Sequence, residues 1–180
     1  MFPFGHLGLG VRLVPMRIRD RLPLGWLAFG CMLPDVIDKP VWYAAAKLEH
    51  WGVPERFDLL LDALHGSRLL GHSLFTVAAL IAAAALTRAE WLRAIAWGVS
   101  THLVLDLVPD IISGARLQWP TWLVWPVFGW GFPGWGSVHG GYVEALIYYA
   151  GELVGAPLIV VEFSRRRRSA RPEPEHPSDA

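Results

Sequence analysis

Long apolar runs with few charges divide the chain into segments of membrane length. Residues 69–86, "LLGHSLFTVAALIAAAAL", contain no formal charge over eighteen positions, close to the roughly 20 needed to cross a hydrocarbon core. Residues 94–109 are apolar except for His102 and Asp106. A third segment, residues 142–163, ends at a run of arginines. The pattern predicts three membrane-spanning helices.

Four further segments have weaker or different patterns. Residues 22–37 are apolar but short and interrupted by Pro34, so we expect a re-entrant or half-inserted segment. Residues 54–66 alternate leucines and acidic residues at helical spacing, which predicts an amphipathic helix on the membrane surface. Residues 119–135 hold five of the ten tryptophans and three prolines, typical of an interfacial loop. Residues 164–180 are polar and are predicted to be disordered.

The predicted fold is therefore all-α: a small polytopic membrane bundle of three or four embedded helices, with an interfacial amphipathic helix and a Trp/Pro-rich loop. Residues 1–163 form one membrane-embedded domain and residues 164–180 an Arg-rich tail. Composition supports this class, since 53% of the residues are hydrophobic and only 18% are charged, against about a quarter in soluble domains.

The charges are unevenly placed although the formal net charge is zero. Arginines cluster at residues 165–168 and again between Arg12 and Arg21, and we interpret them as membrane-flanking groups, with no nucleic-acid partner expected. The positive-inside tendency puts the C-terminus in the cytosol. Cys31 is the only cysteine, which excludes an internal disulfide and a Cys-rich zinc site. Any metal ion must be held by histidines and carboxylates.

Ionisable side chains fall at spacings that bring them together. The spans that carry His72 and His102 are joined by a tight turn, so they are antiparallel and both histidines lie at one membrane depth. Asp106 follows His102 by four residues and shares its helix face. His65 precedes His72 by two helical turns. His6 lies among glycines that permit close backbone approach.

An aspartate in the middle of a membrane helix disfavours insertion by roughly 2.5–3.5 kcal/mol, so such a cluster needs compensation. A divalent cation supplies it, because neutral imidazoles and carboxylates bind the ion and are fixed by it. Zinc, as one or two ions, is favoured by the histidine content. The candidate metal ligands are His6, Asp35, Asp38, His65, His72, His102 and Asp106.

Each of these residues also has a simpler interpretation. His72 alone would be explained by a hydrogen bond to a neighbouring helix, and Asp35 after Pro34 by a helix cap. The pair of His102 and Asp106 has fewer inert explanations, and the joint pattern favours a functional site. Two other functions use the same residues: a small cation or proton transporter, and a structural protein stabilised by a polar network. Metal flux in proteoliposomes would favour the transporter.

Several motifs resemble one known family. His6, "LPDVIDKP", "HGSRLLGHSLF", "THLVLD" and a Trp-Pro loop are similar to those of the LexA-regulated inner-membrane family of metal-dependent hydrolases. The likeness covers residues 1–133. It implies ligand or catalytic roles for the seven candidate residues, and a location in a prokaryotic inner membrane. That family is in turn distantly similar to zinc-dependent phospholipases C and S1-type nucleases.

The chain departs from the family pattern at two places. The aspartates are spaced "DVID", one residue wider than usual, and Lys39 follows where a histidine is frequent. The segment "HGSRLLGHS" has two more residues between its histidines than the usual motif. Both changes affect the assignments of Asp38 and His65.

The sequence thus predicts a membrane-embedded hydrolase in which a metal-activated water cleaves a phosphodiester or related ester bond. Asp38 or Asp106 is expected to act as ligand or base. A site at the membrane interface implies a lipid or another amphiphile as substrate. The residues leave the substrate, the number of ions and the oligomeric state open.

Overall fold

A bundle of helices makes up the part of the chain that the computed structural model describes, which is residues 3–50, 70–112, 123–124 and 142–169. Within these ranges every regular element is a helix, so the all-α prediction is confirmed. The helices are α1 (Pro3–Leu13), α2 (Met16–Arg19), α3 (Leu24–His50), α5 (Leu74–Thr87), α6 (Glu90–Ile112) and α7 (Tyr142–Ser169).

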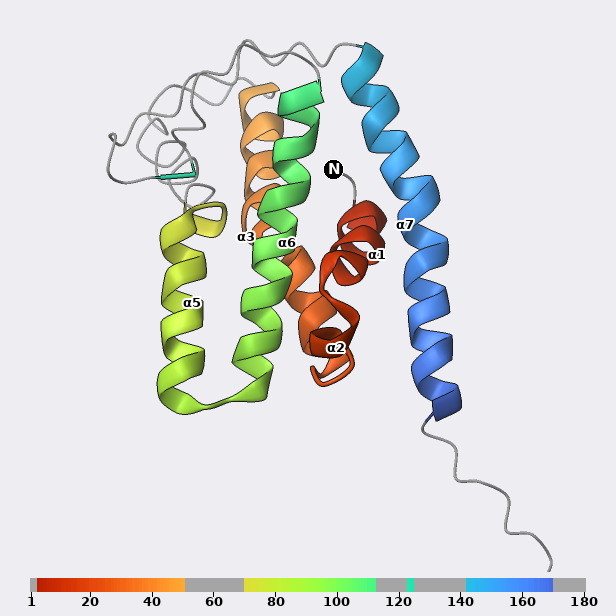
Figure 1. Cartoon of the computed structure of the whole chain (residues 1–180). Coiled ribbons are helices and arrows are strands. Elements are labelled where there is room, and N and C mark those ends of the chain that lie inside the picture. The colour runs from red at the N-terminus through yellow and green to blue at the C-terminus, as the bar shows by residue number, and fades with distance from the viewer. Residues whose placement is uncertain (1–2, 51–69, 113–122, 125–141, 170–180) are drawn as a thin grey trace, which may run out of the picture.

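The longer helices stand side by side with their axes in roughly one direction (Figure 1). Helix α6 is central, because it contacts α3, α5 and α1, while α1 also packs on α3 and on α7. Three features lie at the same end of the bundle, the lower end in Figure 1: α2, the α5–α6 connection and the C-terminal end of α7. The start of α5 and the end of α6 therefore lie at the opposite end.

The α5–α6 connection is as tight as the sequence predicts. Helix α5 ends at Thr87, Arg88 takes a left-handed conformation with φ of 55°, and α6 begins at Glu90. A left-handed residue just after a helix is a common way to end it. The two helices consequently run antiparallel, which places the beginning of α5 beside the later turns of α6.

The first predicted span begins later than expected. We expected a helix over residues 69–86, but α5 begins at Leu74 and has 14 residues. The Ser73 side chain accepts a hydrogen bond from the Thr76 amide at 3.3 Å. Such an N-cap satisfies one of the free amides of the first turn and fixes where the helix starts. His72 therefore lies in the turn before α5 instead of inside a span.

Helix α3 passes through its prolines, so the prediction that Pro34 interrupts the segment is wrong. The helix has 27 residues and contains both Pro34 and Pro40. Proline removes one backbone hydrogen bond, here the one to the Gly30 carbonyl. Pro34 is fully buried, and membrane helices tolerate proline where a neighbouring helix supports the segment. Helix α6 gives that support along the Gly30 face.

Glycines allow two pairs of helices to touch through their backbones. A Cβ on Gly30 would lie 2.5 Å from the Ile95 carbonyl oxygen, and one on Gly98 would lie 2.5 Å from the Cys31 nitrogen. Helices α3 and α6 are thus in main-chain contact. A Cβ on Gly8 would lie 1.9 Å from the Gly155 carbonyl oxygen, so α1 and α7 meet in the same way. Small residues at such contacts are typical of packing between membrane helices.

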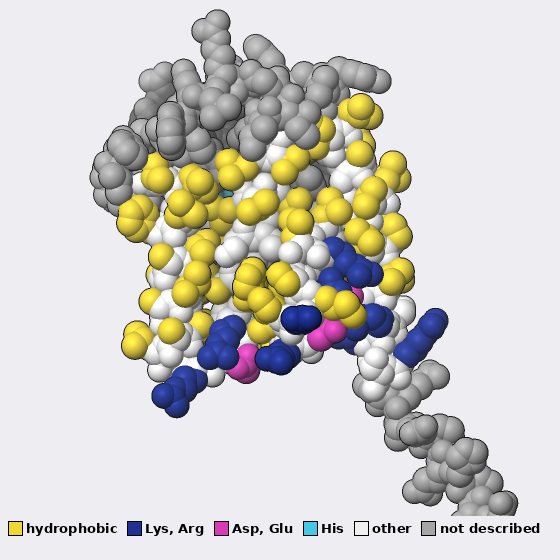
Figure 2. All heavy atoms as spheres, in the orientation of Figure 1, with side chains coloured by type: hydrophobic (Ala, Val, Ile, Leu, Met, Phe, Trp, Pro, Cys, Tyr) yellow, Lys and Arg dark blue, Asp and Glu magenta, His cyan; other side chains and the backbone are white. Residues whose placement is uncertain are grey.

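The outer faces of the bundle are apolar. Leu86, Leu153 and Val160 are 86%, 78% and 62% exposed, and Figure 2 shows apolar side chains over the middle of the molecule, with arginines gathered at the lower end. By length and composition, Ala145–Ser169 of α7 is the one helix of the described residues that meets the criteria for a membrane span. The apolar parts of α3 and α5 are shorter.

Helix α7 continues beyond the predicted start of the tail. We expected disorder from Ser164, but the helix extends to Ser169. The buried carboxylate of Glu162 holds this last part, since its Oε1 lies 2.7 Å from Arg165 and 3.3 Å from Arg166. Arg19 of α2 approaches the same oxygen at 3.6 Å. The predicted surface helix at 54–66, most of the loop at 119–135 and the rest of the tail lie outside the described residues.

Candidate metal centre

His102 lies on α6 with its imidazole fully buried, and its orientation is set by α3. Its Nδ1 lies 2.7 Å from the carbonyl oxygen of Cys31. A carbonyl can only accept, so Nδ1 carries a proton, and in the neutral imidazole Nε2 carries the lone pair. Backbone carbonyls commonly orient metal-binding histidines in this way. The close contact between α3 and α6 brings the two residues to this distance.

Three side-chain atoms form a nearly equilateral triangle next to His102. Its Nε2 lies 3.2 Å from Nε2 of His72 and 3.2 Å from Oδ2 of Asp106, and the last two atoms are 3.4 Å apart. Tetrahedral zinc with bonds of about 2.0–2.1 Å separates its ligands by about 3.3–3.4 Å. The triangle therefore has the dimensions of one face of a zinc site.

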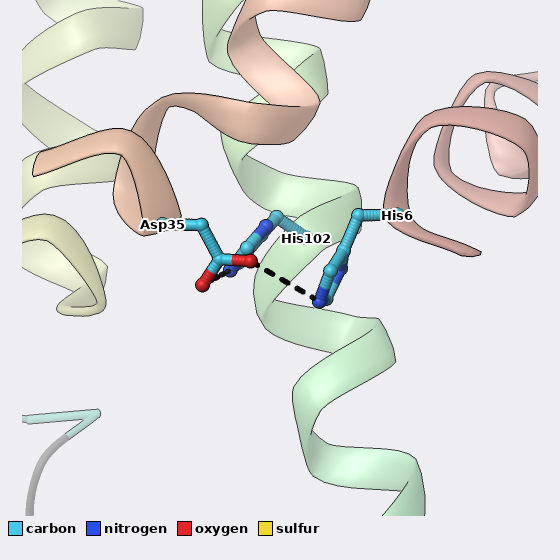
Figure 3. Close-up of side chains that lie close together, drawn as sticks. All are labelled: His6, Asp35 and His102. Carbon is cyan, nitrogen blue, oxygen red and sulfur yellow. Dashed lines mark ion pairs between the residues drawn. The ribbon is translucent and has the colours of Figure 1, made fainter. Parts of the chain in front are cut away.

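A second group, formed by His6 and Asp35, shares the same imidazole (Figure 3). The ring of His6, from α1, stacks on the ring of His102 with centroids 3.9 Å apart. Asp35 of α3 lies beside both, with Oδ2 at 3.8 Å from His6 Nε2 and Oδ1 at 3.9 Å from His102 Nε2. Asp106 connects the two groups, because its Oδ1 is 3.3 Å from His6 Nε2.

His6 is buried with both ring nitrogens lacking a hydrogen-bond partner among the described residues. Buried polar atoms in native proteins nearly always have a partner, so this imidazole calls for one. A cation bound between His6 and the carboxylates of Asp35 or Asp106 supplies it. The donors present, imidazole nitrogens and carboxylate oxygens, are those that zinc accepts. The residues thus fit a metal ion.

Glu152 of α7 fixes the helix that carries His6. Its Oε1 accepts a hydrogen bond from the Gly5 amide at 3.0 Å. Gly5 is in the first turn of α1, where amides have no partner within the helix and where a carboxylate also stabilises the helix dipole. The sequence showed a glutamate within an apolar segment but gave no sign that it caps a helix 147 residues away.

Lys39 is the charged neighbour of this cluster that sequence reasoning did not assign. Its Nζ lies 2.5 Å from Oδ2 of Asp35, one helical turn earlier on α3. The spacing of four residues between an aspartate and a lysine was the available signal. We had noted Lys39 only as a departure from a family pattern.

Of the seven predicted ligands, the structure brings five together: His6, Asp35, His72, His102 and Asp106. They come from α1, α3, the turn before α5, and α6. Asp38 lies within α3, and its side chain is outside the described residues. His65 also lies outside them.

An all-helical bundle, apolar outer faces and a basic end are typical of a small helical membrane protein. The chain belongs to the YdjM inner membrane protein family, which it matches over residues 1–164. No curated protein and no solved structure gives a significant match. The family assignment makes the chain a membrane protein and agrees with the inner-membrane part of the resemblance seen in the sequence.

Proposed function

We propose that this chain is a membrane-embedded, metal-dependent hydrolase that cleaves a phosphodiester or related ester bond in a lipid or another amphiphile. The observation that carries the proposal is the triangle of His72, His102 and Asp106, whose edges of 3.2–3.4 Å match the face of a zinc tetrahedron. The buried imidazole of His6, 3.3 Å from Asp106 Oδ1, adds a further nitrogen donor beside it.

The residues of the triangle would hold one divalent ion, most suitably zinc. When bound, such an ion lowers the pKa of a water molecule and polarises the oxygen of a phosphoryl or acyl group. His102 is held ready by the Cys31 carbonyl, which leaves its Nε2 free to bind. Three ligands from the protein leave a fourth position open, as in catalytic zinc sites.

Asp106 is the proposed link between ion binding and proton transfer. Its side chain is 19% exposed, whereas His6 and His102 are at 0%. One of its oxygens faces His72 and His102 and the other faces His6. A carboxylate in this position binds the ion with one oxygen and accepts a proton with the other. Asp38 remains the second candidate base proposed from the sequence.

Exposed apolar side chains next to the triangle support an amphiphilic substrate. Leu70 and Leu74 lie two residues before and two residues after His72. Both side chains are exposed, at 54% and 47%. Acyl chains would pack on these surfaces while a polar ester group reaches the buried ligands.

The proposal includes an orientation in the membrane. Arginines gather at the end formed by α2, the α5–α6 turn and the end of α7 (Figure 2), and we place this end and the C-terminus in the cytosol. We also propose that α3, α5 and α6 are embedded along with α7. Fusions to the C-terminus test this orientation. We expect a fused fluorescent protein to fluoresce and a fused alkaline phosphatase to be inactive, and the opposite pair of results would show that the orientation is reversed.

Metal analysis combined with a hydrolysis assay tests the function. Detergent-purified protein is loaded with zinc, desalted, and assayed against phospholipids and phosphodiesters. We expect bound zinc and hydrolysis in the wild type, and loss of both in Asp106→Asn, which keeps the side-chain shape. Glu90→Gln, which removes an exposed carboxylate from the same helix, is the control and should retain both. A wild type without zinc, or an Asp106→Asn variant that keeps zinc and activity, would refute the proposal.

A further inference from the structure

We propose that the ammonium group of Lys39 occupies the place of a second metal ion beside His6 and Asp35, so that this centre binds a single divalent ion. This inference rests on the metal centre of the proposed function and deepens it. It concerns the number of bound ions, because the cluster of five ligands alone is compatible with one ion or with two.

The position of the ammonium is the first argument. Lys39 Nζ lies 2.5 Å from Asp35 Oδ2, and the same oxygen is 3.8 Å from His6 Nε2. Asp35 is 7% exposed, whereas Lys39 is 37% exposed. The lysine therefore extends from the edge of the site and delivers its charge to a buried carboxylate. The oxygen that a second ion would need is already neutralised by a cation.

The second argument is that the two groups of ligands compete for one nitrogen. His102 Nε2 belongs both to the group with His72 and Asp106 and to the group with His6 and Asp35. Because Nδ1 donates to the Cys31 carbonyl, His102 has a single lone pair to offer. The group with edges of 3.2–3.4 Å is the tighter, and the distances from Asp35 are 3.8 and 3.9 Å. Among the described side chains, an ion held by the first group leaves a second ion only His6, Asp106 Oδ1 and Asp35 as donors, so its binding depends on Asp35 being free of Lys39.

Charge is the third argument. The described side chains at the site include two carboxylates, Asp35 and Asp106, and one ammonium, Lys39. Counting these described groups alone, with neutral imidazoles, one divalent ion leaves one net positive charge and a second ion would leave three. Uncompensated charge in a low-dielectric interior is strongly unfavourable. Removal of the Lys39 ammonium lowers this excess and frees Asp35 for a second ion.

Metal stoichiometry of the full chain tests the inference. Wild type, Lys39→Met and Lys39→Arg are loaded with excess zinc in detergent, desalted, and measured by elemental analysis together with protein concentration. We expect one ion per chain in the wild type and in Lys39→Arg, and two in Lys39→Met. Arg93→Met, which removes an exposed cation paired with Glu90, should keep one ion. Each protein must elute as a single species, and Lys39→Gln replaces Lys39→Met if the latter does not fold.

Two ions in the wild type, or one ion in both Lys39→Met and Lys39→Gln, would overturn the inference. Hydrolysis measured on the same samples separates this result from the proposed function. One ion in the wild type and two in Lys39→Met without any hydrolysis would keep the inference and reject the hydrolase. Two ions in an active wild type would support the hydrolase and reject the single-ion inference. No ion in any sample would reject both proposals.

Discussion

His72 and His102 present their Nε2 atoms to each other at 3.2 Å, from positions 30 residues apart. His102 donates from its other nitrogen, so in the neutral imidazole the Nε2 lone pair is directed at His72. A proton on one of the two Nε2 atoms, or a cation, must lie between them. The adjacent Asp106 carboxylate favours a cation as well as a proton, and this geometry allows direct tests.

Removal of one imidazole should weaken metal binding. His72→Ala takes away one corner of the triangle and leaves His102 and Asp106 in place. We expect the zinc affinity to fall at least about tenfold, since even loss of an outer-shell partner has that effect. Competition with a chromophoric chelator measures the affinity. An affinity equal to that of the wild type would exclude His72 as a ligand.

Because α3 and α6 touch through their glycines, adding one methyl group at this contact should lower the stability of the protein. Gly98→Ala would place a Cβ 2.5 Å from backbone atoms of α3, and we expect destabilisation of about 1–3 kcal/mol. Gly25→Ala is the matched control on α3, because no atom lies within 4 Å of its Cβ position. It should stabilise the helix by about 0.5–1 kcal/mol. Thermal unfolding in detergent compares the two, and equal melting temperatures would contradict the contact.

Loss of the Glu162 carboxylate should destabilise the basic end. Glu162 is fully buried and pairs with Arg165, while Arg19, also buried, approaches it at 3.6 Å. Glu162→Gln removes the acidic partner of the buried Arg19 and one of the two described acidic partners of Arg165, and we expect a loss of about 2 kcal/mol. Glu90→Gln breaks the exposed pair with Arg93 and should have hardly any effect. Chemical unfolding in detergent that gave the same loss for both variants would contradict this assignment.

Acidification should remove one contribution to stability at the same end. Arg165 donates a hydrogen bond to Asp20 and thereby lowers the pKa of that carboxyl below its usual 3.8. A lowered pKa means that the contribution is complete above the usual value and disappears as the pH falls through the lowered one. Asp20→Asn should therefore melt slightly below the wild type at neutral pH and together with it in strong acid. A difference that stays constant with pH would show that the pair contributes through something other than charge.

The sequence predicted the proximity of His72, His102 and Asp106 because their arrangement depends on local geometry. His102 and Asp106 are one helical turn apart, and a tight turn forced two apolar helices to be antiparallel, which brought His72 to the same place. Those relationships follow from helix periodicity and from the length of one connection. Asp35 and His6 were also identified, as residue types that suit a metal.

Other features depended on contacts that the spacing of apolar and polar residues in the sequence did not identify. Pro34 was expected to interrupt a helix, and it does not, because α6 packs against that part of α3. Ser73 caps the start of α5, so this helix begins after His72, which was expected to lie inside it. Glu152, on the neighbouring helix α7, caps α1. Glu162 stabilises α7 past Ser164. The partners of Pro34 and Glu152 are distant in the chain, whereas Ser73 and Glu162 act through neighbours three or four residues away that the hydrophobic pattern did not identify.

The glycine contact between α3 and α6 also limits how the centre can change. Because main chains touch at Gly30 and Gly98, the distance from His102 to the Cys31 carbonyl depends on backbone contact and not on the volume of aliphatic side chains. Exchange of Leu27 or Val99 for another aliphatic residue would alter stability while leaving the ligand spacing intact. For the proposed metal ion, the main chain would thus set the ligand spacing, and side chains around the site could vary without changing it.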